Sequence, residues 1–347
     1  MSADLDADVL VVGGGPVGLA AAIEARLAGL SVVVVEPRVG PIDKACGEGL
    51  MPGAVAALSR LGVHPDGQPL AGISYRDERS HVDHRFRAER GLGVRRTVLH
   101  AALLDRCADL GAERVVARVT EVRQGPTDVE AAGVSARWLL ACDGLHSTVR
   151  RLVGLEAAEP RSPARSSGRR FGLRRHFAVS PWSDLVEVHW GPTAEAYVTP
   201  VGSGEVGVAL LGPRGVDFDL ALGSFPALSR RLAGAGPTST VRGAGPLRQR
   251  TTARTTGRVR LVGDASGYVD ALTGEGLRVG LAQARAAVAH LDDGAGYERA
   301  WRAATRDYRL LTSGLVAWAT SPARRGVVPV AKAAPWLFGT VVETLAR

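Results

Sequence analysis

Apolar and polar positions in the first part of the chain predict alternating strands and helices. Residues 9–12 and 32–35 are unbroken apolar runs of strand length, which are typical of buried parallel strands. Between them, a glycine-rich turn at 13–15 precedes a helical segment that Gly29 closes. A second helical pattern ends at Gly62. The opening of the chain is therefore expected to form a strand, helix and strand in succession.

The next hundred residues continue with a mixture of both periods. Residues 73–90 alternate apolar and polar side chains and predict a hairpin. The apolar residues of 94–111 recur at helical spacing and indicate an amphipathic helix. We expect further strands at 114–122 and 138–142.

The second half of the chain begins with a change in composition. Ser, Pro, Gly and Arg dominate residues 161–170, which we interpret as a crossover between two regions. Short alternating runs separated by glycine turns then predict an antiparallel sheet within 171–211. A helical pattern follows at 218–232, a strand at 259–262 and a long helix at 276–291.

The glycine-rich turn has the spacing of a dinucleotide-binding fingerprint. In GxGxxG order, Gly13 permits a tight turn, Gly15 lets the backbone approach a pyrophosphate, and Gly18 lets the helix pack closely on the strand. Pro16 suits the first helical turn, where its missing N–H has no partner to lose. Glu36 ends the second strand, where an acid accepts hydrogen bonds from ribose hydroxyls. Together they predict a bound dinucleotide.

Composition limits the classes of protein that remain. The chain has 347 residues, of which 46% are hydrophobic, so it can fold two domains or one domain with an insertion. The formal net charge is +8, yet lysine occurs only at Lys44 and Lys332, and the arginines are scattered without interleaved aromatic residues. We therefore expect no nucleic-acid partner.

The cysteines and both ends of the chain bear on its location. Cys46, Cys107 and Cys142 show no CxxC spacing, so we expect neither a disulfide framework nor a metal site, and a reducing cytoplasm fits best. The acidic first residues do not resemble an export signal. Residues 310–345 are apolar and aromatic but interrupted by arginines. We expect them to form helices that cover a pocket or touch a membrane surface weakly.

Residues 262–276 resemble the GD motif of FAD-dependent monooxygenases and geranylgeranyl reductases. The resemblance implies that Gly263 and Asp264 hold FAD, with the carboxylate on the ribityl chain. The start of the following helix would then meet the N1–C2=O edge of the flavin through its backbone N–H groups. Gly267 and Ala271 stand where aromatic hydroxylases usually carry histidine and proline. The residues implied at the helix start are Gly274, Gly276 and Leu277.

Residues 142–150 resemble the DGxxSxVR element of aromatic hydroxylases. In that family the element supports FAD and helps the nicotinamide cofactor to dock, which implies these roles for Asp143, Gly144 and Arg150. Arg96 matches the arginine at the start of a family helix, where the side chain lies against FAD. A surface ion pair is the alternative for Arg96.

Residues 43–52 resemble the Lys-Pro-Cys-Gly-Gly loop that lies beside the flavin ring in geranylgeranyl reductase-like proteins. The resemblance implies that Cys46 lines the active site, although it could equally be a small buried residue. Glu48 would position substrate, support FAD or cap a local helix. The strand at 196–200 lacks the tryptophan of the reductases' aromatic motif, which favours a hydroxylase.

The chain is thus identified as a member of the group A flavoprotein monooxygenase and geranylgeranyl reductase-like superfamily. The implied fold is α/β, with a glutathione-reductase-like FAD-binding Rossmann domain, an inserted antiparallel β-sheet substrate domain and C-terminal helices. We expect the FAD domain at 1–72, 92–160 and 246–297, the substrate domain at 73–91 and 161–245, and the helical segment at 298–347.

The implied function is an FAD-dependent monooxygenase, a hydroxylase or epoxidase of secondary metabolism. It would use NAD(P)H and O2 on an aromatic or unsaturated small molecule. Only one dinucleotide fingerprint is evident, so NAD(P)H would dock transiently on the FAD domain. The alternative is a reductase or dehydrogenase of the geranylgeranyl type that acts on a conjugated or polyprenyl alkene. We expect His176, His189 and Trp190 to be core residues rather than catalytic ones.

Overall fold

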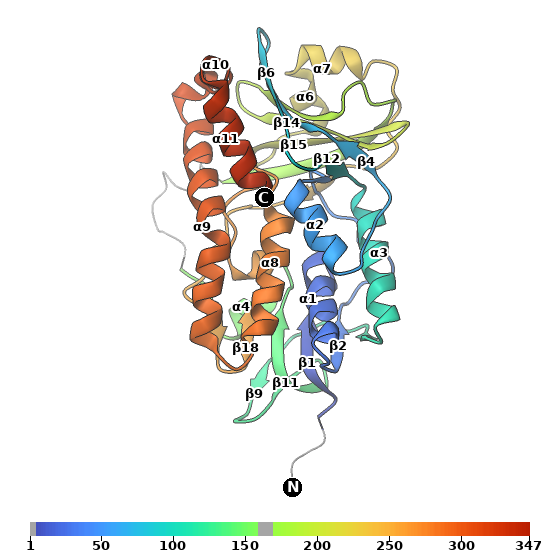
Figure 1. The fold of residues 1–347 in the computed structure, drawn as a ribbon, viewed down its shortest axis with the longest axis vertical. Helices are drawn as coiled ribbons and strands as arrows, with labels where there is room; N and C mark the ends of the chain where they lie inside the picture. Colours follow the sequence, from blue (N-terminus) through green and yellow to red (C-terminus); the bar gives the residue numbers. More distant parts are fainter. Residues whose placement is uncertain (1–4, 159–168) are drawn as a thin grey trace.

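The computed structural model of the protein describes residues 5–158 and 169–347. A mostly parallel sheet of eight strands occupies the lower half of the molecule in Figure 1. Its central strand, β1 (Ala7–Val12), pairs in parallel with β2 (Val32–Val35) and with β11 (Val134–Ala141). The other strands of this sheet are β8 (Glu113–Val115), β9 (Arg123–Gln124), β10 (Val129–Ala131), β17 (Thr255–Thr256) and β18 (Val259–Leu261).

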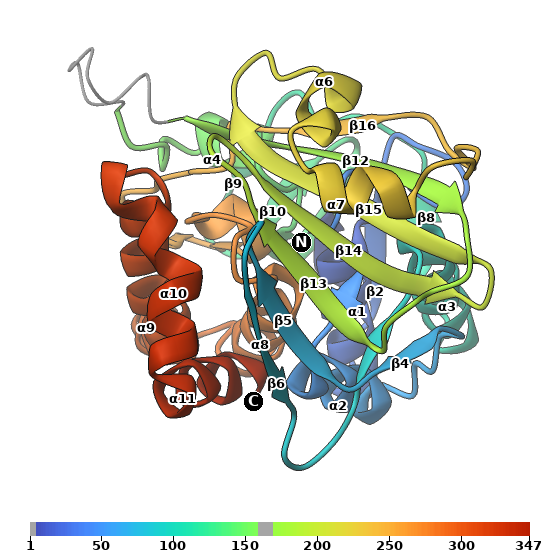
Figure 2. The same ribbon diagram turned by 90° about the horizontal axis from the view of Figure 1, so that it is seen from above.

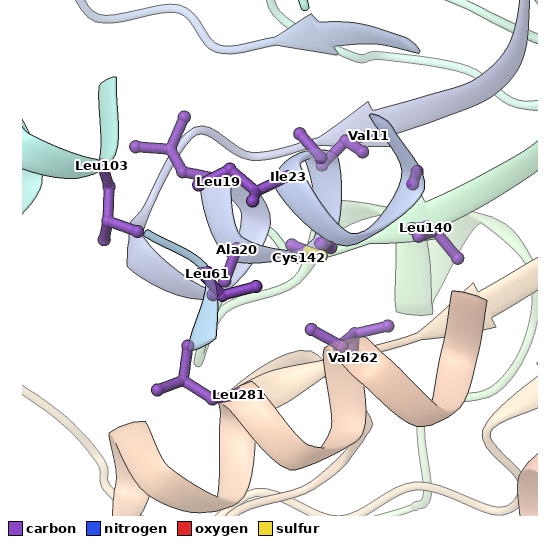
Figure 3. Packing of buried hydrophobic residues seen from close by; sticks show 14 of the residues in the cluster. Val11, Leu19, Ala20, Ile23, Leu61, Leu103, Leu140, Cys142, Val262 and Leu281 are labelled. Carbon is purple, nitrogen blue, oxygen red and sulfur yellow. The ribbon is translucent and has the colours of Figure 1, made fainter. Parts of the chain in front are cut away.

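Three helices pack against this sheet: α1 (Pro16–Leu27), α3 (Arg96–Asp109) and α8 (Gly276–Ala289) (Figure 1). The apolar core between them includes Val11 of β1 and Leu281 of α8 (Figure 3). A fully buried side chain of this size stabilises the fold by roughly 1.5–3 kcal/mol. The strand, helix and strand predicted at the start of the chain are therefore confirmed as β1, α1 and β2.

A second sheet of seven strands lies above the first in Figure 1 and is seen from above in Figure 2. Its strands pair antiparallel except for β13 and β5, which are parallel. The hairpin predicted at 73–90 supplies β5 and β6 and is confirmed. Across the sheet the strands are β16 (Arg242–Ala244), β12 (Arg170–Ala178), β15 (Glu205–Pro213), β14 (Glu195–Gly202), β13 (Leu185–Trp190), β5 (Gly72–Arg76) and β6 (His81–Arg85).

Both faces of the second sheet are covered. On β14, Ala196 and Val198 pack into an apolar cluster with α6 (Phe218–Gly223) and α7 (Pro226–Arg231). The intervening Tyr197 belongs to a different cluster, on the other face. This alternation follows from the two-residue period of a strand. The face that carries Tyr197 is the one that forms a wall of the candidate site.

Short elements connect the two sheets. A small sheet of three strands has β7 in its centre, and its first strand follows directly on the loop that lines the candidate site. These connecting elements are β3 (Gly49–Leu50), α2 (Pro52–Arg60), β4 (Gln68–Leu70), β7 (Gly91–Gly93), α4 (Thr148–Leu152) and η1 (Gly263–Ser266).

Helices at the end of the chain run beside both sheets (Figures 1 and 2). The contacts of α10 and α11 include β6, at the edge of the second sheet. Arg324 donates to Glu195 of β14 (2.6 Å), and Arg170 of β12 donates to the other carboxylate oxygen (2.6 Å). This buried pairing ties the C-terminal part to the sheet. The elements are α9 (Gly294–Ala319), η2 (Pro322–Gly326), α10 (Val327–Ala333) and α11 (Pro335–Ala346).

The structure corrects two predicted elements. The strand expected at 114–122 is only the short β8, because the chain then leaves the sheet edge and residues such as Val119 line the cavity instead. The helix expected at 218–232 is split into α6 and α7, because Pro226 has no N–H to continue the helix. The crossover predicted at 161–170 lies mostly outside the described residues.

Candidate cofactor and substrate cavity

One cavity of about 940 Å³ extends from the glycine turn to the C-terminal helices. This volume lies near the upper end of the range for small-molecule sites, roughly 300–1,000 Å³. Its walls come from the first sheet, the loop after β2, the second sheet, and α9 to α11. The predicted site residues on its walls are Gly13, Gly15, Pro16, Glu36, Cys46, Glu48, Arg96, Asp143, Gly144, Gly263, Asp264, Gly274, Gly276 and Leu277.

The three fingerprint glycines are required by close approaches of the backbone. Gly13 has a φ of 103°, and a Cβ there would lie 2.6 Å from the carbonyl oxygen of Cys142. A Cβ on Gly18 would lie 1.8 Å from the carbonyl oxygen of Gly13, so only glycine lets α1 start this close to β1. At Gly15 the nearest atom to a Cβ is Nη2 of Arg96, 3.9 Å away. Gly15 therefore leaves space at the start of α1, where backbone N–H groups favour an anion.

Glu36 lies at this polar end of the cavity and is already an acceptor. Its side chain is buried, and Oε2 accepts from the N–H of Gly14 (2.9 Å). Arg38 donates to Oε1 (2.7 Å). Burial raises the pKa of Glu36, but the hydrogen bonds from Arg38 and Gly14 outweigh this effect and leave the pKa below its ordinary value. The carboxylate is thus ionised at neutral pH and can accept hydrogen bonds from hydroxyl groups.

Asp264 faces positive charge deeper in the cavity. Burial raises its pKa, and the charges of Lys44, Arg96 and Arg150 oppose that rise. For the ammonium group of Lys44, burial has the opposite effect and lowers the pKa, and the charge of Asp264 offsets part of this shift. Nζ of Lys44 is 3.3 Å from the position of a Cβ on Gly144, so the ammonium group lies against this loop. A mixed set of charges therefore surrounds the middle of the cavity.

Lys44 was not among the predicted site residues. The sequence nevertheless carried a signal, since only two of the 43 basic residues in the chain are lysines and one of them is in this loop. His100 was also missed: its Nε2 lies 2.7 Å from the carbonyl oxygen of Gly14 and supports the glycine turn from behind. Nothing local in the sequence marks that contact.

The loop at 142–150 divides its residues between the cavity and the structure behind it. Asp143 lines the cavity; one carboxylate oxygen accepts from the N–H of Val149 (3.0 Å), and the other is buried without a partner among the described atoms. Arg150 does not line the cavity. Its buried guanidinium donates to the carbonyl oxygens of Ala265 (3.2 Å) and Leu145 (3.0 Å). Arg150 is therefore a positioning residue rather than a direct contact for a bound molecule.

Glu48 caps a helix, one of the three alternatives left open for it. Its φ is 60°, and Oε1 accepts from the N–H of Arg96 (2.8 Å) at the start of α3. Oε2 lies 2.5 Å from Nε2 of His176, and the side chain is buried. With each oxygen engaged by the protein, Glu48 forms part of the cavity wall.

The rest of this loop is anchored to the second sheet in the same way. Asp43 pairs with Arg174 and accepts from Arg242 (3.1 Å). Thr199 donates to the carbonyl oxygen of Gly47 (2.7 Å). Cys46 is half-buried between these anchors and lines the cavity.

The loop before α8 is fixed from the second sheet as well. Tyr197 donates to the carbonyl oxygen of Leu272 (2.7 Å). A Cβ on Gly276 would lie 3.1 Å from the ring of Tyr268, so this aromatic ring closes over the helix start. Glu275 is buried there, and burial raises its pKa to about 7 despite the opposing charge of Arg278.

The far end of the cavity is apolar. Tyr75, Val188 and Leu211 line it from the second sheet, and Leu315 and Phe338 line it from the C-terminal helices. Among the three residues expected to be core, His176 pairs with Glu48, His189 lies 3.0 Å from Glu187, and Trp190 packs 5.4 Å from the ring of Tyr75. None of these three lines the cavity.

Comparisons with known proteins place this chain in a family. The family described as FAD binding domain matches residues 6–169. Menaquinone reductase of Mycolicibacterium smegmatis is 32% identical over an alignment 331 positions long, which covers 85% of this chain and 79% of that protein. The chain belongs to the FAD-dependent oxidoreductases of the group A flavoprotein monooxygenase and geranylgeranyl reductase-like superfamily.

Other relatives of this FAD-dependent oxidoreductase match shorter parts or only the fold. Rifampicin monooxygenase of Streptomyces venezuelae is 31% identical over an alignment 175 positions long, which covers 46% of this chain and 36% of that protein. The structure of p-nitrophenol 4-monooxygenase from Pseudomonas putida covers 96% of this chain and 98% of its own, with a TM-score of 0.76 at 19% identity. FAD is the cofactor of the family.

The cavity fits FAD by two observations. First, no side chain could be accommodated at Gly13 or Gly18. A side chain at Gly15 would fill the approach to the start of α1. Second, three buried polar atoms on cavity-lining residues lack partners among the described atoms: Oδ1 of Asp143, Nε of Arg96 and Oε1 of Glu275. Such atoms are costly unless a ligand or water satisfies them.

Proposed function

We propose that the protein is an FAD-dependent monooxygenase that uses NAD(P)H and O2 to oxygenate an apolar aromatic or unsaturated small molecule. One observation carries the proposal: the polar end, suited to a dinucleotide, continues into an apolar chamber without a dividing wall. In the overall reaction, NAD(P)H, a proton, O2 and substrate give NAD(P)+, water and oxygenated substrate. We place the reaction in secondary metabolism. We also place it in the cytoplasm, because the three cysteines, all within the described residues, form no disulfide.

Several residues would hold FAD in the cavity. The start of α1 after Gly15 would bind the diphosphate, Glu36 the ribose and Asp264 the ribityl chain. The start of α8 at Gly276 would meet the N1–C2=O edge of the flavin, where the positive end of the helix dipole stabilises negative charge. Bound FAD supplies the hydride acceptance and oxygen activation that no side chain of the protein provides.

The apolar chamber contributes by position and by excluding water. Side chains such as Val188, Leu211 and Leu315 offer no hydrogen bonds, so a substrate is held by its shape and apolar surface. A dry chamber would also limit side reactions with water. No acid or base of the chamber is required for the oxygen transfer.

NAD(P)H would bind transiently beside the same cavity. The GxGxxG spacing from Gly13 to Gly18 lies between a strand and a helix, where FAD would occupy the turn. The same spacing at Gly202 to Gly207 lies in the β14–β15 hairpin and opens no helix, so it offers no second dinucleotide site. The loop at 142–150 is the proposed docking point, with Asp143 and Gly144 on the cavity wall and Arg150 holding the loop from behind.

A second candidate function is reduction of an alkene or quinone-like molecule. It is favoured by the share of this chain that the relatives match. Menaquinone reductases match 84–85% of the chain, including the second sheet, whereas rifampicin monooxygenases match 42–46%. In that reaction a hydride would add to one carbon of the double bond and a solvent-derived proton to the other. The same apolar chamber would accept either class of substrate.

The two functions are separated by the fate of oxygen. Purified FAD-loaded protein is mixed with NAD(P)H and a panel of aromatic and polyprenyl substrates, with and without O2. Monooxygenation predicts oxygen uptake equal to product, with label from 18O2 in the product, and nearly unchanged turnover in Cys46→Ser. Anaerobic formation of a saturated product, lost in Cys46→Ser, would refute the monooxygenase and establish the reductase.

A further inference from the structure

An apolar rim surrounds one end of the cavity. We define this rim as Leu310 of α9, Val330 of α10, and Trp336 and Leu337 of α11. Their side chains are 71%, 46%, 72% and 45% exposed, respectively. Leu310, Val330 and Leu337 also line the cavity. Because the same residues face both solvent and cavity, the cavity opens between these helices.

The rim lies where three helices of the C-terminal part meet. α10 and α11 contact each other, α11 contacts α9, and all three lie together at one side of the molecule (Figures 1 and 2). Exposed apolar side chains that are adjacent to one another mark an interaction site more strongly than isolated ones. No helix among the described residues is long and apolar enough to cross a bilayer. Any lipid contact would therefore be superficial.

The charges near the rim indicate what it contacts. Residues 322–347 carry four basic side chains and a single acid, Glu343, and one of the four, Arg324, is already paired with Glu195. Glu343 is already engaged, because it lies 2.7 Å from Nε2 of His84 and accepts from the N–H of Arg87. Lys332 on α10 and Arg325 before it are exposed. Exposed apolar residues beside uncompensated positive charge are typical of segments that lie on anionic membranes.

We propose that the rim docks on an anionic lipid bilayer, so that an apolar substrate enters the cavity from the membrane. The inference rests on the proposed function, since it concerns how the substrate of that cavity arrives. Trp336 and Leu337 would enter the interface, where tryptophan is favoured, while Lys332 and Arg325 would meet lipid phosphates. The cavity mouth would then face the hydrocarbon.

The test is vesicle flotation of the full-length, FAD-loaded protein. Phosphatidylglycerol vesicles are compared with phosphatidylcholine vesicles, each at low and high salt. We expect binding to phosphatidylglycerol that salt weakens, and a loss of about tenfold or more in Trp336→Ser/Leu337→Ser. Leu220→Ser is the matched control, because Leu220 on α6 is 81% exposed and lies away from the cavity lining.

A charge pair of variants tests the second part of the inference. Lys332→Glu should weaken binding to phosphatidylglycerol severalfold, whereas Arg214→Glu, an exposed position on the loop before α6, should not. Equal binding of the rim variant and the Leu220→Ser control would overturn the proposal. A dimer in solution that dissociates in Trp336→Ser/Leu337→Ser but not in Leu220→Ser would also overturn it, since the rim would then contact a second copy of the chain.

The outcome is separable from that of the proposed function. Oxidation of NAD(P)H with substrate dispersed in detergent reports the chemistry without vesicles. Turnover there combined with no flotation would refute only the docking. Flotation without any substrate-dependent turnover would refute the proposed function and retain the docking surface.

Discussion

Glu48 and His176 form a buried pair in the cavity wall, with Oε2 of the carboxylate 2.5 Å from Nε2 of the ring. The pair joins the loop after β2 to β12 of the second sheet. Because the other oxygen of Glu48 caps α3 at Arg96, one side chain holds three segments together. The shape of the cavity beside Cys46 therefore depends on Glu48.

Replacing Glu48 should consequently affect folding before it affects chemistry. Glu48→Met supplies no acceptor oxygen, so the N–H of Arg96 and Nε2 of His176 lose their partner, at a cost of about 1.5–3 kcal/mol or more. Chemical denaturation should show this loss. Glu130→Gln is the control, since Glu130 is exposed and lies 3.8 Å from Arg123, a pair worth well under about 1 kcal/mol. Equal unfolding free energies for both variants would show that the Glu48 pair does not stabilise the wall.

A second prediction concerns the only lysine in the cavity. Lys44 offsets the charge of Asp264 and faces the proposed ribityl and phosphate positions. Lys44→Met should weaken FAD binding about tenfold, while Lys44→Arg, which keeps the charge, should weaken it less. Fluorescence titration of FAD measures both. Lys332→Met removes the other lysine, which is exposed on α10, and should leave FAD affinity unchanged.

The difference between Lys44 and Glu48 shows what the sequence could and could not predict. The strand, glycine turn and helix at 7–27 were predictable because their signals are local: apolar runs, glycine spacing and a helix start. The role of Glu48 depends on His176, which is 128 residues away, and no pattern within one segment contains that pairing. The prediction of a strand at 114–122 was wrong for a related reason: residues 117–119 line the cavity instead of pairing in the sheet.

Arg150 leads to a third prediction, in which stability and cofactor binding change together. Its guanidinium satisfies the carbonyl oxygens of Leu145 and Ala265 behind the cavity. Arg150→Met leaves those acceptors unpaired, which should cost roughly 1–3 kcal/mol or more and loosen the loop that carries Asp143. Melting temperature, FAD affinity and flavin reduction by NAD(P)H should all fall.

The matched control for Arg150 is its neighbour. Arg151→Met alters an exposed side chain with one weak contact to Thr148 (3.3 Å), so it should change none of the three quantities. A variant of Arg150 that slowed reduction by NAD(P)H with unchanged melting temperature and FAD affinity would instead indicate a direct nicotinamide contact.

The buried carboxyl of Glu275, at the start of α8, makes a fourth prediction about pH. Burial raises its pKa from an ordinary value of 4.5 to about 7 in the folded protein, and Arg278 opposes this only in part. Between those two values the folded protein retains a proton that the unfolded chain has released. The stability contributed by this group is therefore full at low pH, falls as the pH rises through that interval, and stays low above about 7.

Glu275→Gln isolates this contribution, because glutamine keeps the shape of the protonated acid and does not titrate. The pKa difference corresponds to roughly 3 kcal/mol, an upper limit for the loss in the wild type. Urea unfolding at pH 5, 6, 7 and 8 should show the variant close to the wild type at pH 5 and more stable at pH 8. The exposed Glu78→Gln serves as the control and should follow the wild-type curve. Parallel curves for wild type and Glu275→Gln would mean that Glu275 is ionised throughout, and that the charge of Arg278 outweighs burial.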